Sequence, residues 1–297
     1  MSGKVIMRLN TDLYEEPTQS DLDEAKAFVR QRNNYASLLE SMILQILRDA
    51  AKEITEICYK YNIDGTEFTL QSNPQMYSEV QAVMDRIFDE IMELIQNYST
   101  MAATTEDEKE HLLQYVMALG RENKNLNDTL EEYLWRYLYD LEALIASMKV
   151  AEYGVTDASA KIVGALQSVY ATPEVRNAFS VPGIAAMYLK SKGVHYHRGT
   201  HIATVGLSNS GAVNVVNMAK ITLAMAWNRY QATEFEEEGA IGYYQLRGSN
   251  YPCHTCDDQV GFHRGIVDIF AKPLVHPHCC CYRVPIFQKQ AEEIFGQ

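Results

Sequence analysis

The chain has 297 residues, 47% of them hydrophobic, which is enough to bury the cores of about two globular domains. A net charge of −13 opposes contact with phosphate backbones, so we expect no tight nucleic-acid binding by the bulk of the chain. No apolar run is long enough to cross a bilayer, and the first eight residues lack the apolar segment of a signal peptide, so we expect a protein made in the cytoplasm with no membrane partner.

The first two thirds of the sequence predicts a series of amphipathic helices. A long first helix is expected to begin at Ser20, where Asp21 and Asp23 place negative charge in the first turn, and to end near Gly65. Cys58 falls on the apolar face of this helix and is predicted to be a small core residue. Further helices are expected over residues 80–98, 105–120, 130–148, 157–170, 182–190 and 211–238. Thr105 to Glu108 has the form of a capping box and is predicted to open the helix over 105–120.

Aromatic residues gather in the helix predicted over 130–148, at Tyr133, Trp135, Tyr137 and Tyr139. Such a group could form a ligand-binding box. At helical spacing, however, aromatic side chains more often pack against neighbouring helices. We therefore predict that these four residues pack.

The pattern of the chain changes near residue 191. Residues 191–210 are rich in glycine, so we predict a linker there, between a helical region over 1–190 and a smaller module over 211–297. In the module the helical period gives way to alternation, which predicts short strands over 241–247 and 282–286. The predicted fold class is mainly α, with an N-terminal helical region followed by a small α+β module.

Five of the six cysteines lie in two short clusters of the C-terminal module. The first cluster reads Cys253-His254-Thr255-Cys256, and the second reads His276-Pro277-His278-Cys279-Cys280-Cys281. A Cys-x-x-Cys pair turns both sulfurs toward one point, and the second cluster can bring further ligands there, as in tetrahedral zinc sites. We predict a structural Zn²⁺ site that staples the module, with five candidate ligands: Cys253, Cys256, His276, Cys279 and Cys281.

These candidates exceed by one the four ligands of a tetrahedral site, and the sequence leaves open which four bind. Cys253 and Cys256 form the most secure pair. If the chain is extended from Cys279 to Cys281, these two side chains share a face and Cys280 points away. The remaining histidines of the region fall off the ligand spacing and are expected in solvent or beside the site: His254, His263 and His278.

Other uses of the paired cysteines fit the sequence less well. Disulfides are disfavoured in a protein without a secretory signal, because the cytoplasm keeps thiols reduced. A redox-active Cys-x-x-Cys pair would not require the second cluster. A module that keeps its fold without metal is the third alternative.

Enzyme functions find little support, and we predict no catalytic residues. The stretch from Pro252 to Cys256 matches half of a zinc deaminase motif, but the chain contains no His-x-Glu or Cys-x-Glu to complete it. The alternative function is an ADP-ribosyltransferase-like or toxin-type enzyme, suggested by a short pattern at 197–200, 208–210 and Glu236-x-Glu238. Both glutamates close a predicted helix and are expected to face solvent, and short patterns of this kind arise easily by chance.

The C-terminal third resembles a known family. A helix, a strand, a Cys-x-x-Cys pair, a glycine and then His-Pro-x-Cys-x-Cys before a short strand are similar to the C-terminal module of phage head morphogenesis proteins, the phage Mu F-like minor head proteins. The resemblance covers about residues 207–287, and the family often has asparagine and arginine where this chain has His278 and Cys280. The matching residues are Cys253, Cys256, Gly261, His276, Pro277, Cys279 and Cys281.

The resemblance implies a structural role in a phage or prophage. It implies a minor head (capsid) protein that acts in head assembly at or near the portal vertex, with portal or major capsid proteins as partners. The implied location is the virion, in the head interior or at the portal vertex, after synthesis in the host cytoplasm. The helical region before residue 207 lies outside the resemblance.

Overall fold

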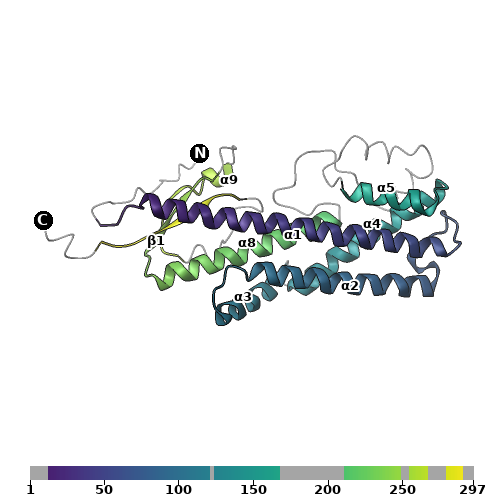
Figure 1. The fold of residues 1–297 in the computed structure, drawn as a ribbon, viewed down its shortest axis with the longest axis horizontal. Coiled ribbons are helices and arrows are strands. Elements are labelled where there is room, and N and C mark those ends of the chain that lie inside the picture. The colour runs from purple at the N-terminus through teal and green to yellow at the C-terminus, as the bar shows by residue number, and fades with distance from the viewer. Residues whose placement is uncertain (1–12, 121–123, 168–210, 249–253, 267–278, 290–297) are drawn as a thin grey trace. The chain divides into compact units, whose positions relative to one another are not determined.

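The computed structural model describes residues 13–120, 124–167, 211–248, 254–266 and 279–289. Within them the chain is mainly α-helical with one small antiparallel sheet, which confirms the predicted fold class (Figure 1). The helix predicted over 182–190 and the linker predicted over 191–210 lie outside the described residues, so the domain boundaries stay a prediction. The helices that occupy predicted stretches are α1 (Gln19–Lys60), α2 (Pro74–Ser99), α3 (Glu106–Ala118), α4 (Leu126–Val150), α5 (Val155–Gln167) and α8 (Gly211–Glu237).

Local capping explains where two of these helices begin. At the start of α3 the Glu108 carboxylate accepts hydrogen bonds from the Thr104 and Thr105 backbone amides at 2.7 and 3.0 Å. The Glu108 amide in turn donates to the Thr105 hydroxyl at 3.3 Å, so the predicted capping box is confirmed. Before α1, Thr18 and Asp21 exchange the same pair of bonds.

None of the helices in the described ranges is both long and apolar enough to span a membrane.

The chain forms two compact units, each assembled from separate stretches of sequence, and α1 and α8 each contribute to both units. We call them the helical unit and the sheet unit and describe each by itself. The helical unit contains Leu39–Gln96 and Met117–Ala219. The sheet unit contains Met1–Leu38, Asn97–Val116 and Lys220–Gln297.

In the helical unit, parts of α1, α2 and α4 bury their apolar faces. Ile54, Ile87 and Leu141, one from each helix, are fully buried. The Tyr137 hydroxyl of α4 donates to the Leu47 carbonyl oxygen of α1. Cys58 is also fully buried, and this burial raises the pKa of its thiol to about 12, which confirms its predicted place in the core.

The aromatic residues of α4 divide between two faces. Tyr133 and Tyr137, four positions apart, are buried, as predicted. Trp135 and Tyr139 are 45% and 40% exposed, so the prediction that all four pack was wrong for these two. An offset of two residues turns a side chain to the opposite side of a helix, and the residues on that side of α4 meet solvent.

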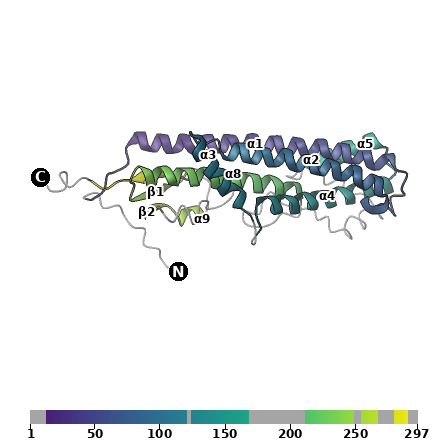
Figure 2. The same ribbon diagram turned by 90° about the horizontal axis from the view of Figure 1, so that it is seen from below.

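The sheet unit contains a three-stranded antiparallel sheet in the order β2-β1-β3, whose strands β1 and β2 are labelled in Figure 2. Its strands are β1 (Gly242–Leu246), β2 (Gly261–Arg264) and β3 (Tyr282–Ile286). The sequence predicted β1 and β3 but not β2. One buried cluster beside the sheet consists of Ala232 and Phe235 from α8 with Tyr243 and Ile266.

Within the sheet unit, α8 packs on the first part of α1 through Trp227. The Trp227 ring centroid lies 5.2 Å from that of Phe28 and 5.6 Å from that of Tyr35. The buried indole Nε1 donates to the Tyr98 carbonyl oxygen at 3.2 Å. These contacts hold α1 and α8 beside one another next to the sheet, which places α1 residues within reach of the cysteines that precede β3.

Candidate metal centre

Pairing of β1 with β3 brings the two cysteine clusters together. The last residue of β1, Leu246, pairs with the first residue of β3, Tyr282, so the cysteines just before β3 lie beside the chain that leaves β1. That chain leads to the short helix α9 (His254–Asp257), which carries Cys256. An ion pair of 2.5 Å between Arg247 Nη1 and Asp257 Oδ1 ties α9 to the end of β1.

Three cysteine sulfurs converge at this point. The Sγ atoms of Cys256, Cys279 and Cys281 all lie within 4.8 Å of one another. The Cys256 and Cys279 sulfurs are 3.8 Å apart, far longer than the roughly 2.05 Å of a disulfide bond. Cys256 and Cys279 are buried and Cys281 is half-buried. The arrangement could therefore hold a metal ion through three thiolates.

The structure brings together three of the five predicted ligands. The other two, Cys253 and His276, lie outside the described residues. Cys280 is not one of the three converging sulfurs; its Sγ accepts a hydrogen bond from Asn33 Nδ2 at 3.7 Å. Like Cys280, His263 was predicted to be no ligand, and its ring stacks on Tyr243 in the sheet with centroids 4.7 Å apart.

A glycine makes the close approach of the two segments sterically feasible. A Cβ atom on Gly248, two residues after β1, would lie 1.7 Å from the carbonyl oxygen of Cys280. The three nearest atoms all belong to Cys280 and two of them are backbone, so an added Cβ has no space. The Gly248 amide also bonds to the Cys281 sulfur, which favours the thiolate form of Cys281.

Hydrogen bonding between Cys279 and Cys281 shifts the pKa values of the two thiols in opposite directions. The Cys279 thiol donates toward Cys281, which lowers the pKa of Cys281 and raises that of Cys279. Burial raises both pKa values and is the smaller cause in each case. Cys281 is therefore the more acidic thiol of the two, and metal binding would require both thiols to lose their protons.

Two buried guanidinium groups lie next to the sulfurs. Arg32 of α1 is 3% exposed and donates to the Cys279 carbonyl oxygen at 2.6 Å and to Asn228 Oδ1 at 2.9 Å. Arg283 of β3 is 7% exposed and donates to Gln245 Oε1 at 3.3 Å. Burial lowers the pKa of both arginines. Electrostatic attraction opposes this shift, chiefly to Cys279 for Arg32, and to Tyr243 and then Cys279 for Arg283. Positive charge beside the sulfurs favours thiolates over thiols.

Arg32 was not predicted from the sequence as part of the site. A signal was present, because Arg32 lies seven positions from both Ala25 and Leu39, which are buried residues of α1. A charged residue on the apolar face of a helix needs a specific partner. The sequence could not name that partner, since Cys279 lies 247 positions away.

The residues that suggested an enzyme gain no support from the geometry. Glu236 and Glu238 are exposed at the end of α8, as predicted. The accompanying pattern at 197–200 and 208–210 lies outside the described residues. Comparison of the chain with protein-family models, with curated proteins and with solved structures found no match. The resemblance to phage minor head proteins therefore stays a prediction based on the cysteine pattern.

Proposed function

We propose that this chain is a structural minor head protein of a phage or prophage, which acts in head assembly at or near the portal vertex and contains a structural zinc ion. The observation that carries the proposal is the convergence of Cys256, Cys279 and Cys281 from the two clusters that resemble the minor head proteins. Portal or major capsid proteins are its proposed partners, and the virion is its proposed location.

Zinc is the metal that these ligands fit best. Zinc binds thiolates at about 2.3 Å in a tetrahedron, which separates two bound sulfurs by about 3.8 Å. The Cys256 and Cys279 sulfurs have that separation. Cys253 or His276 would supply the fourth ligand. A site filled by protein ligands is closed to substrate and has a structural role.

The proposed zinc ion would stabilise the fold of the sheet unit. Three strands of four or five residues offer little stability of their own. A structural zinc ion contributes about 10–16 kcal/mol in comparably small modules. The ion would hold α9 and the chain before β3 in place, and thereby fix the surface that this unit presents to a partner.

The test has two independent parts. Elemental analysis of freshly purified protein should find about one zinc per chain, and a chain without stoichiometric zinc would remove the metal from the proposal. Particles purified from a phage or prophage that encodes this chain should contain it by mass spectrometry, and deletion of its gene should reduce the yield of complete heads. Normal heads that lack the chain would overturn the proposed function whatever the metal content.

A further inference from the structure

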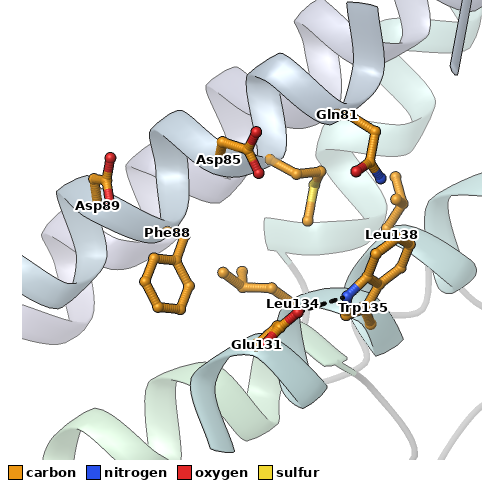
Figure 3. A pocket seen from close by; sticks show the side chains of 9 residues that line it. Gln81, Asp85, Phe88, Asp89, Glu131, Leu134, Trp135 and Leu138 are labelled. Carbon is orange, nitrogen blue, oxygen red and sulfur yellow. Dashed lines mark hydrogen bonds between the residues drawn. The ribbon is translucent and has the colours of Figure 1, made fainter. Parts of the chain in front are cut away.

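An open groove lies between α2 and α4 on the helical unit, with a volume of about 370 Å³ (Figure 3). Met84 and Phe88 of α2 and Leu134 and Leu138 of α4 give it an apolar floor. Trp135 stands at its edge and is 45% exposed. Tryptophan combines a large apolar surface with one hydrogen-bond donor, which is why it is enriched where proteins bind one another.

Carboxylates rim this apolar floor on both walls. Asp85 and Asp89 stand on α2, and Glu131 stands on α4, where its Oε1 accepts a hydrogen bond from Trp135 Nε1 at 3.4 Å (Figure 3). All three residues are exposed, and no lysine or arginine of the described chain lines the groove. The groove therefore combines an apolar floor with negative charge on its rim.

A second hollow on the same unit shows a different distribution of charge. It lies between α1 and α2, and there Arg86 pairs with Glu53 at 2.5 Å and Lys60 pairs with Glu79 at 3.4 Å. The groove lacks such internal pairs, since neither Asp85 nor Asp89 forms an ion pair within the described residues. The carboxylates of Asp85 and Asp89 can therefore pair with cationic side chains of a binding partner.

A second copy of this chain fits the groove poorly. In a symmetric dimer the same patch meets itself, so the acidic rim of one copy would face the acidic rim of the other. Like charges placed opposite one another disfavour association, and each chain carries a net charge of −13. The occupant must instead bring positive charge together with apolar side chains.

We propose that the groove binds a basic amphipathic helix of another protein. Apolar side chains spaced three and four residues apart on one face of that helix would contact Phe88, Leu134 and Trp135. Lysine and arginine side chains at the edges of the apolar face would meet Asp85 and Asp89 on one wall and Glu131 on the other. Recognition of an amphipathic helix by a groove between two helices is a recurring mode of peptide binding.

Synthetic peptides test the proposal on the full chain. The probe is a fluorescently labelled helical peptide with leucine and phenylalanine on one face and lysine and arginine on the other. One matched peptide replaces the basic residues by glutamate, and a second keeps the composition but scrambles the order. Fluorescence anisotropy should show saturable binding of the probe at least about tenfold tighter than binding of either matched peptide, and weaker binding at high salt.

Variants of exposed residues locate the binding and leave the core intact. The double substitution Asp85→Asn with Asp89→Asn should weaken probe binding about five- to tenfold, as expected for two exposed ion pairs. Trp135→Ser should weaken it about tenfold. Glu93→Gln, at an exposed position of α2 outside the groove, should leave the affinity unchanged.

Three outcomes would overturn the proposal. The glutamate peptide could bind as tightly as the basic one. The double aspartate variant could keep its affinity for the probe while Glu93→Gln behaves identically. Sedimentation could reveal a dimer of this chain that Trp135→Ser abolishes, which would identify a second copy as the occupant. Circular dichroism of each variant confirms that the helices are retained.

Discussion

The guanidinium of Arg32 lies against the backbone of Cys279, with Nη2 donating to the Cys279 carbonyl oxygen at 2.6 Å although the two residues are 247 positions apart. The same side chain donates to Asn228 of α8. One buried side chain of α1 therefore joins α8 to the second cysteine cluster. Both acceptors are neutral, and electrostatic attraction to the cysteines, chiefly Cys279, opposes the lowering of the Arg32 pKa by burial.

We predict that Arg32→Met destabilises the protein and weakens binding of the proposed zinc ion. The substitution leaves the Cys279 carbonyl and the Asn228 side chain without this buried donor and removes positive charge beside the thiolates. We expect the free energy of unfolding to fall by about 2–4 kcal/mol, measured with guanidinium chloride. Transfer of the metal to a chromophoric chelator should also become faster.

The control for this prediction is Arg30→Met on the same helix, because Arg30 is exposed. Arg32→Lys keeps the charge but loses the planar fork of donors, so an intermediate effect is expected. Equal behaviour of Arg30→Met and Arg32→Met would contradict the role assigned to Arg32.

We predict that three cysteine substitutions abolish binding of the proposed zinc ion and that two do not. Cys256→Ser, Cys279→Ser and Cys281→Ser should each reduce the bound metal to well below one equivalent, because their sulfurs converge. Cys280→Ser and Cys58→Ala should keep about one equivalent. Elemental analysis gives the stoichiometry, and the absorption spectrum of the cobalt-substituted protein reports the number of sulfur ligands. Loss of metal from Cys280→Ser alone would show that the ligand set is different.

Gly248→Ala should disrupt the metal centre through steric overlap. The added methyl group would lie 1.7 Å from the Cys280 carbonyl oxygen, and backbone cannot move aside as a side chain can. We expect a loss of about 2 kcal/mol or more in the free energy of unfolding, together with weaker metal binding. Gly154→Ala is the matched control, because an added Cβ there meets nothing within 4 Å. A Gly248→Ala protein as stable as that control would refute the close approach.

Asp140 should contribute less stability to the helical unit as the pH rises from about 4 to 6. Burial raises the pKa of Asp140 to about 6 from a usual value of 3.8, although the Gly211 backbone N–H donates to Asp140 Oδ2 at 2.8 Å and Arg136 lies nearby. The folded protein therefore holds this proton more tightly than the unfolded chain does. The stabilisation is complete below about pH 4 and is lost as the pH rises through the folded pKa of about 6.

Asp140→Asn tests this dependence. Asparagine keeps an oxygen for the Gly211 N–H at the start of α8 and carries no charge. The variant should equal the native protein near pH 4 and be more stable by about 1–3 kcal/mol at pH 7.5, measured by denaturant unfolding at each pH. Glu93→Gln controls for the removal of one exposed negative charge. A stability difference between Asp140→Asn and the native protein that does not grow over this pH range would contradict the prediction.

Local features of the sequence predicted most of the helices because helix formation depends on spacing along a few turns. The apolar period placed α1, α2 and α4, and the residues from Thr105 to Glu108 formed the predicted capping box. Strand β2 was missed because its four residues show no alternation of their own. It exists through its pairing with β1, where Phe262 lies opposite Tyr244.

The sequence by itself determined the helical character of the chain and the two cysteine clusters, since both are patterns among near neighbours. The tertiary structure decided which sulfurs meet, that Arg32 supports them, and that Trp135 stands exposed beside a groove with an acidic rim. These relationships join segments up to 247 positions apart. Strand pairing and helix packing create them, and no spacing within a single segment contains that information.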